Sequence, residues 1–199
     1  MTRYAALISY DGSAFHGFQR QRGLPTVQEA LEDALSLLNK GMVRVTGAGR
    51  TDRGVHALGQ VVSFDMFWPH GPDVLRKALE ANLPPSIGIF EVVPVDEGFD
   101  ARKSALWRKY AYFIWKGDCR LPHLDEHLWR NGKPWDMQKA RAFLSMIKGH
   151  HDFSAFCRKA DLPDNAWRTI IDAKLENIGH MIKVTIIGRS FLTNMVRII

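Results

Sequence analysis

The residues best placed to do chemistry lie in one short stretch, residues 47–57 (GAGRTDRGVHA). It holds a single acid, Asp52, between two arginines, Arg50 and Arg53. A guanidinium group can bind phosphate through two parallel hydrogen bonds, and a carboxylate that lies among cations stays ionised at neutral pH. Asp52 is therefore either the acid of a structural ion pair or a catalytic group that acts as an anion.

Apolar runs flank this stretch and predict how it is positioned. Residues 43–45 lead into it and residues 60–64 lead out of it, which is typical of two strands joined by a glycine-rich loop. Glycine lets such a loop turn tightly and lets its backbone come close to a ligand. The sequence therefore predicts that the polar groups lie on a loop between two strands.

Residues 1–100 predict the order strand, helix, strand, strand, helix, strand, which is a ferredoxin-like pattern. The clearest helix begins with a capping box, Thr26-x-x-Glu29, in which the hydroxyl and the carboxylate each satisfy a free backbone N–H. Its apolar residues recur at helical spacing and form one buried stripe. The predicted elements are strands at 4–10, 42–46, 60–64 and 87–95, and helices at 26–39 and 72–81.

Residues 101–199 repeat most of this order, so we expect a second ferredoxin-like half that is incomplete. Tyr110 and Tyr112 should share one face of its first strand, because strand side chains alternate. The sequence thus predicts an α+β protein of two domains, 1–100 and 101–199, with a mixed, mainly antiparallel sheet and helices on one face. The elements expected in the second half are strands at 106–115, 169–176 and 180–187, a helix at 136–148 and a helix from 190 onward.

Charge and hydropathy restrict the partner and the compartment. The 199 residues carry a net charge of +6, which favours an anionic partner such as nucleic acid, although mildly basic cytosolic proteins are frequent. Residues 15–23 carry Arg20 and Arg22 and are either an RNA-contacting loop or a solvated polar loop. No run approaches the roughly 20 apolar residues that span a bilayer, and the N-terminus does not resemble a signal peptide. We therefore expect a soluble, cytoplasmic protein with no membrane partner.

Metal and redox chemistry is not expected. The cysteines, Cys119 and Cys157, lack zinc or redox spacing and are expected to be free thiols. His123 and His127 flank Asp125, but a zinc site needs a third and a fourth ligand that the neighbouring sequence does not supply. A phosphate-binding P-loop motif is also missing. We therefore expect neither a metal nor a cofactor.

The motifs taken together resemble those of the tRNA pseudouridine synthase A family. The segment Gly49-Arg50-Thr51-Asp52-x-Gly54-Val55-His56-Ala57 is similar to the signature of that family, and so many fixed positions make the match specific. The other matches follow in the expected order over essentially the whole chain: Tyr10-Asp11-Gly12-Ser13 with Gly17 and Gln19; Asn82-Leu83-Pro84; Ala101-Arg102 with Ser104, Ala105, Arg108, Tyr110 and Tyr112; His151-Asp152-Phe153-Ser154-x-Phe156; and Phe191-Leu192-x-x-Met195-Val196-Arg197.

This resemblance implies that the protein isomerises uridine to pseudouridine in tRNA, in the anticodon stem-loop at positions 38, 39 and 40. The uracil leaves C1′ of the ribose, turns, and rejoins it through C5, so nothing is hydrolysed and no cofactor or metal is needed. The resemblance also implies a homodimer with tRNA lying across both subunits. Members of the family normally run past this length, so we expect a chain that is truncated relative to them.

The resemblance also assigns the site. Asp52 is the expected catalytic residue, and it either attacks C1′ as a nucleophile or takes a proton from C2′ as a general base. The target nucleotide must be flipped out of the stem; Tyr110 would stack on its uracil, and Arg50 would fill the vacated space or hold a phosphate. Arg197 would pair with Asp52, although its position alone fits a helix-surface arginine. His56 is expected to shape the loop through hydrogen bonds rather than to carry a proton.

Other classes of protein would share some of these features. A non-catalytic RNA-binding module would show the same basic and aromatic residues, but an acid in the middle of its phosphate-facing loop would repel RNA. A glycoside hydrolase usually needs two carboxylates that flank the bond; Asp52 has no second acid nearby in sequence, although Asp65 or Asp100 could approach it in space. A metal-dependent nuclease needs clustered acids and loses activity in chelator.

If the basic residues form the RNA surface, tRNA binding should weaken steeply with salt, because each neutralised phosphate releases condensed counterions. Fluorescence anisotropy of labelled tRNA, repeated over a range of potassium chloride concentrations, measures the dependence of Kd on salt. A Kd that stays flat across that range would contradict the assignment of the basic residues to the RNA surface.

Overall fold

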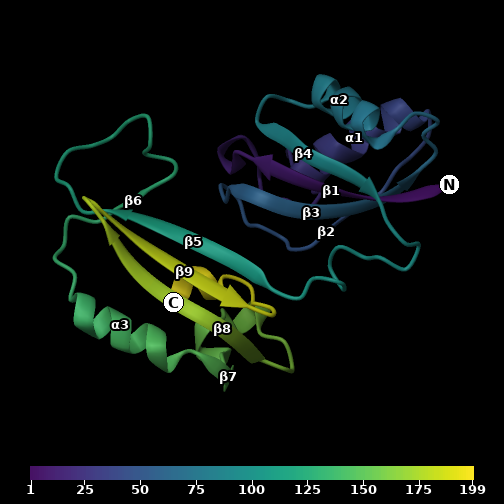
Figure 1. The fold of residues 1–199 in the computed structure, drawn as a ribbon. Coiled ribbons are helices and arrows are strands. Elements are labelled where there is room, and N and C mark those ends of the chain that lie inside the picture. Colours follow the sequence, from purple (N-terminus) through teal and green to yellow (C-terminus); the bar gives the residue numbers. More distant parts are fainter. The chain divides into compact units, whose positions relative to one another are not determined.

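A computed structural model describes residues 1–199, which divide into an N-terminal unit, Met1–Ala105, and a C-terminal unit, Leu106–Ile199. Each unit has a sheet and an apolar core of its own (Figure 1). The predicted α+β class is confirmed. The strands form two sheets, one in each unit, where the sequence predicted one.

The N-terminal unit is a four-stranded antiparallel sheet in the order β2-β3-β1-β4, and helices α1 and α2 cover one face of it (Figure 1). All six elements predicted for this half are present. They are β1 (Thr2–Tyr10), α1 (Val27–Asn39), β2 (Val45–Gly47), β3 (Ala57–Met66), α2 (Pro72–Asn82) and β4 (Ile87–Pro94), with a 3-10 turn η1 at Gly12–Ala14.

The core of this unit follows from the alternation of side chains along β1 and from the helical repeat of apolar residues along α1. Alternate residues of β1 point to the helical face, where they are buried against the apolar stripe of α1. The side chains in question are Tyr4, Ala6, Ile8 and Tyr10 of β1, and Val27, Leu31, Ala34 and Leu35 of α1. The core therefore fixes β1, whose last residue, Tyr10, borders the polar loop.

The cap of α1 is formed only in part as predicted. The hydroxyl of Thr26 accepts a hydrogen bond from the backbone N–H of Glu29 at 3.3 Å, which satisfies one free donor of the first turn. The Glu29 carboxylate does not return a bond to Thr26; it lies 3.3 Å from the guanidinium of Arg20. A nearby cation from another segment has replaced the second half of the capping box.

A buried carboxylate joins α1 to the segment that enters β2. Glu32 is 2% exposed, and its Oε1 accepts hydrogen bonds from Val45 N–H at 3.1 Å and from Gln28 Nε2 at 3.0 Å. Its Oε2 accepts from Nη1 of Arg20 at 3.0 Å and of Arg44 at 3.2 Å. The N–H of Val43 donates to the hydroxyl of Ser36 on α1 at 2.9 Å, so this part of the chain is bound to the helix, and β2 begins at Val45 and not at residue 42 as predicted.

The C-terminal unit is a five-stranded sheet in the order β6-β5-β9-β8-β7, in which only the β5–β6 pair is parallel. The helix α3 packs against β8 and begins, as predicted, after Asp136, whose carboxylate accepts from the backbone N–H groups of Gln138 and Lys139. The elements are β5 (Arg108–Trp115), β6 (Trp129–Arg130), α3 (Met137–Met146), β7 (Gly149–Asp152), β8 (Trp167–Ile178), β9 (Met181–Gly188) and α4 (Met195–Ile198), with 3-10 turns at Ser154–Phe156 and Lys159–Asp161.

Three elements of this unit differ from the predictions, and one of them is β6, a two-residue strand that was not predicted. The helix expected from residue 190 begins only at Met195, because Asn194 adopts a left-handed conformation with φ +60° immediately before it. The edge strand β7 was missed, because its sequence, Gly-His-His-Asp, is exposed throughout and has no apolar alternation. None of the helices combines the length and the apolar character that crossing a bilayer requires.

The network around Glu32 gives a test of stability. Glu32→Gln removes the charge that two guanidinium groups share inside the N-terminal unit, and we expect the free energy of unfolding to fall by about 2 kcal/mol, since both arginines stay partly solvated. Urea denaturation followed by circular dichroism measures this change.

Asp33→Asn is the matched control, because Asp33 is exposed on the same helix and lies 3.9 Å from Arg20. It should change the stability by less than about 0.5 kcal/mol. Equal effects of the two substitutions would contradict the structural role of Glu32.

Candidate active site

The loop of residues 48–56 joins β2 to β3, and its first residues still belong to the sheet hydrogen-bond pattern. The N–H of Ala48 donates to the carbonyl of Val61 at 2.8 Å. The side-chain amide of Gln60 donates to the carbonyl of Gly49 at 2.7 Å. These bonds fix the position at which the chain leaves β2, so the backbone that leads to the polar residues is ordered.

The centre of the loop rests on the N-terminal segment. The hydroxyl groups of Tyr10 and Thr51 lie 2.8 Å apart, and the backbone N–H of Phe18 donates to the carbonyl of Thr51 at 3.0 Å. Tyr10 and Phe18 are both buried in the core of the unit. Thr51, the residue before Asp52, is therefore held through its side chain and through its backbone.

The end of the loop is tied to the turn after β1 by His56. The Nδ1 atom of His56 lies 3.1 Å from the backbone nitrogen of Gly12 and 3.0 Å from Oδ1 of Asp11. An unprotonated Nδ1 accepts from the Gly12 N–H, whereas a protonated Nδ1 donates to Asp11. In either state His56 links the loop to this turn, which fits the loop-shaping part expected for it.

Two glycines of the N-terminal motif permit this close approach. A Cβ on Gly12 would lie 2.2 Å from the carbonyl oxygen of Val55, a distance at which backbone would have to move. Gly17 has φ +97°, and a Cβ there would lie 2.8 Å from the carbonyl oxygen of Thr51. Gly12 therefore requires glycine because of the loop, and Gly17 requires it both because of the loop and because of its own positive φ.

Asp52 and Arg50, two of the four predicted site residues, sit at the exposed part of this loop. The carbonyl of Asp52 accepts from the N–H of Val55 at 3.1 Å, which closes a turn in which Gly54 has φ +76°. Hydrogen bonds to Thr51 and within the turn thus fix the backbone around Asp52, while the side chains of Asp52 and Arg50 are exposed to solvent. This arrangement suits groups that act on a ligand arriving from outside.

Tyr110 and Arg197, the other two, lie in the C-terminal unit. Tyr110 stands on β5 on the same face as Tyr112, as predicted from alternation, opposite Ile186 of β9. Its ring meets Phe191 edge to face, with centroids 5.0 Å apart and an interplanar angle of 84°. Arg197 is exposed on α4. Because Asp52 belongs to the other unit, the pairing of Arg197 with Asp52 stays a prediction.

Neither of the acids considered as a second carboxylate lies near this loop. Asp65 is eight residues beyond Ala57 along β3, roughly 26 Å at 3.3 Å per residue, and it pairs with Arg3 at 3.5 Å. Asp100 precedes Ala101, whose N–H donates to Oγ of Ser63, six residues beyond Ala57 along β3. The backbone N–H groups of Lys103 and Arg102 donate to the Asp100 carboxylate, and these bonds, the one from Lys103 above all, lower the pKa of that carboxyl group. The acid that does approach the loop is Asp11, which sequence reasoning missed.

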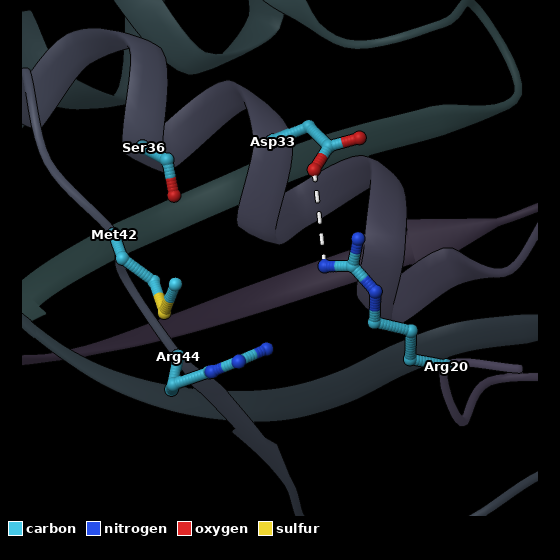
Figure 2. A pocket seen from close by; sticks show the side chains of 5 residues that line it. All are labelled: Arg20, Asp33, Ser36, Met42 and Arg44. Carbon is cyan, nitrogen blue, oxygen red and sulfur yellow. Dashed lines mark ion pairs between the residues drawn. The ribbon is translucent and has the colours of Figure 1, made fainter. Parts of the chain in front are cut away.

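Arg20 of the segment 15–23 is engaged by acids of α1. Its guanidinium lies 3.0 Å from Glu32, 3.3 Å from Glu29 and 3.9 Å from Asp33. Figure 2 shows the last of these pairs, with Arg20 and Arg44 lining a pocket beside α1. The hydrogen bond that Arg20 donates to Glu32, together with the attraction of the three carboxylates, raises the pKa of Arg20 above its usual value. Its charge is offset locally, so Arg20 is a structural residue first.

Metal-binding residues do not gather anywhere in the structure: no group of three or more His, Cys, Asp or Glu side chains is placed to hold an ion. Cys119 is exposed and Cys157 is half-buried, and both are free thiols.

Sequence reasoning did not identify Tyr10 and Thr51 as the residues that support the loop. Both lie inside quoted motifs, but sequence spacing could not show that the two motifs touch.

Comparison with known proteins places these features in one family. Residues 6–102 and 144–199 match the family described as tRNA pseudouridine synthase. A protein of Geobacillus sp. (strain WCH70) named tRNA pseudouridine synthase A is 42% identical over 198 residues, which cover 99% of this chain and 80% of that protein. The protein of the same name from Streptococcus pneumoniae (strain Hungary19A-6) is 36% identical over 200 residues, with the same coverage.

The contact between Gly12 and Val55 can be tested without an activity assay. Gly12→Ala places a methyl group against backbone that has no room for it, so we expect the free energy of unfolding to fall by about 1–3 kcal/mol. Thermal or urea unfolding measures the change. Gly98→Ala is the control, since a Cβ at Gly98 meets nothing within 4 Å. A Gly12→Ala variant as stable as this control would contradict the close packing of the turn on the loop.

Proposed function

Since this chain belongs to the tRNA pseudouridine synthase family, we infer that it is an isomerase that converts uridine to pseudouridine in tRNA. The observation that carries this function is the loop of residues 48–56, which presents Asp52 on a backbone held by buried residues of the N-terminal motif. Proteins that bear the name tRNA pseudouridine synthase A align with 99% of this chain.

The reaction is a rearrangement within one nucleotide. The bond between N1 of uracil and C1′ of the ribose breaks, the base turns, and a bond forms between C5 and C1′. The hydrogen on C5 leaves as a proton and N1 gains a proton, so atoms and electrons balance without an oxidant or a hydrolytic water. A carboxylate is the only chemical group that this scheme requires from the protein at the ribose.

Asp52 is the residue that we assign to this step. Its carboxylate is exposed on a loop whose backbone is fixed, so a nucleotide flipped out of a stem can reach it. Attack of Asp52 on C1′ gives a covalent intermediate, and removal of the C2′ proton gives an elimination product; both routes need the carboxylate as an anion. The proposal holds for either route.

Three further residues complete the proposed site. Tyr110 stacks on the uracil, and its edge contact with Phe191 supports this role because it fixes the orientation of the ring. Arg50, exposed two residues before Asp52, fills the space that the flipped base leaves or holds its phosphate. Arg197 pairs with Asp52, which requires the two units to meet at this site.

The substrate position and the assembly follow from the family resemblance of the motifs. We propose that the uridines lie in the anticodon stem-loop, at positions 38, 39 and 40 of tRNA. We also propose that the protein acts as a homodimer, with tRNA across both subunits, in the cytoplasm. The net charge of +6 supports an anionic partner such as tRNA.

We further propose that the units are two ferredoxin-like domains, 1–100 and 101–199. The N-terminal unit supports this with its element order and its strand order β2-β3-β1-β4, in which the two strands that precede the helices are central. In the C-terminal unit β5, β9 and β8 take the corresponding order.

Asp52→Asn tests the assignment of the catalytic residue. It keeps the size of the side chain and removes its charge, so we expect tRNA binding within about threefold of wild type and a rate lower by roughly 10³-fold or more. Nuclease digestion of the tRNA and chromatography of the nucleosides measure pseudouridine, and filter binding measures Kd.

Asp33→Asn, on α1, serves as the control, because it makes the same carboxylate-to-amide change at an exposed residue outside the loop and should keep the wild-type rate. Near wild-type pseudouridine formation by Asp52→Asn would remove Asp52 from the reaction. Intact tRNA binding with no pseudouridine from the wild type would favour a non-catalytic RNA-binding module.

A further inference from the structure

We propose that Tyr10 is a positioning residue for Asp52: its buried hydroxyl, acting through Thr51, sets where the catalytic carboxylate stands. The inference rests on the proposed function, because it assumes that Asp52 carries out the chemical step. It adds a residue that makes no contact with substrate, and it gives the N-terminal motif a part in catalysis.

Tyr10 contacts the loop through its backbone and through its side chain. Its backbone is paired with Ala57, the first residue of β3, after a register shift in β1 between Ile8 and Tyr10. Its side chain crosses beneath the loop, and its hydroxyl lies 2.8 Å from Oγ1 of Thr51. One buried residue thus reaches both the centre of the loop, beside Asp52, and the point where the loop ends.

The phenol ring has little freedom to move away from Thr51. Tyr10 is 4% exposed and packs against Phe18, with ring centroids 6.4 Å apart. Phe18 in turn fits against Gly47, where a Cβ would lie 2.5 Å from the ring. Because protein interiors are close-packed, this packing fixes the position of the Tyr10 hydroxyl beneath the loop.

Thr51 transmits this position to Asp52 through the next peptide bond. Its carbonyl is already bound by the N–H of Phe18, so the hydroxyl bond to Tyr10 sets the remaining orientation of the residue. Beyond Asp52 the turn contains Gly54, which has φ +76° and around which a Cβ would meet nothing within 4 Å. The bond from the Val55 N–H to the Asp52 carbonyl and the packing of Val55 on Gly12 hold the far side of the turn, and Thr51 sets the position of Asp52 from the near side.

The catalytic consequence follows from geometry. A displacement of about 1 Å of a reacting group can cost roughly 100-fold in rate. Without the bond to Tyr10, Thr51 can turn about its own dihedral angles and move the Asp52 carboxylate, while the core below the loop stays packed. The loss should therefore fall mainly on the chemical step, because Arg50 is the one proposed tRNA contact besides Asp52 in this loop.

Tyr10→Phe is the test, and Tyr4→Phe is its matched control. Tyr4 lies on the same strand and the same face, is 5% exposed, and stacks on Phe64 with centroids 5.9 Å apart, well away from the loop. Thr51→Val removes the other hydroxyl of the pair, and Thr51→Ser retains it. Each variant is assayed under single turnover for tritium release from tRNA labelled at C5 of uridine, for tRNA Kd, and for melting temperature.

We expect Tyr10→Phe to slow the single-turnover rate by about 10- to 100-fold, with Kd within about threefold of wild type, and Tyr4→Phe to keep the wild-type rate. Thr51→Val should match Tyr10→Phe, the double variant should be no slower than either, and Thr51→Ser should recover most of the rate.

Three outcomes would overturn the proposal. They are a wild-type rate in Tyr10→Phe, a loss that appears in Kd alone, and equal losses in Tyr10→Phe and Tyr4→Phe that follow the melting temperature. Failure of the wild type itself to release tritium would instead reject the proposed function, so the two failures are distinguishable.

Discussion

The hydrogen bonds between the N-terminal segment and Thr51 are the constraint on which the rest of the site depends. A loop of nine residues between two strands has many conformations, and ordering it costs about 1–2 kcal/mol of conformational entropy per residue. The bonds of buried Tyr10 and Phe18 to Thr51, and the bond between His56 and the turn after β1, offset that cost. The core of the N-terminal unit thereby sets the position of an exposed acid, which a loop alone could not do.

The arginines show how the same side chain serves two ends in this fold. Arg20 and Arg44 converge on the buried carboxylate of Glu32, and their charge is used to join α1 to the start of β2. Arg50 is exposed in the loop that carries Asp52, three residues after that same short strand. Counting positively charged residues therefore overestimates the surface that can bind phosphate. The surroundings of each arginine decide whether it stabilises the fold or is available to a ligand.

Much of the fold could be predicted because its signals are local. Alternation in β1 and β9, the apolar stripe of α1 and the Asp136 cap each depend on neighbours within a few residues. The start of β2 could not be predicted, since it depends on hydrogen bonds between its backbone and α1 side chains, and β7 could not, since it is an exposed edge strand. At the site, the motifs identified Asp52, Arg50, Tyr110 and Arg197, but the support from Tyr10 and Asp11 arises from contacts between segments about 40 residues apart, which no spacing rule encodes.

The most direct measurement of the central claim is the ratio of tritium released to pseudouridine formed, with excess chelator present, on tRNA labelled at C5 of uridine. The account predicts one tritium lost for every pseudouridine made, at a rate that chelator does not change, because a protein carboxylate and no metal ion carries the rearrangement. Cleavage of the labelled uracil from the tRNA, or a rate that chelator abolishes, would contradict it.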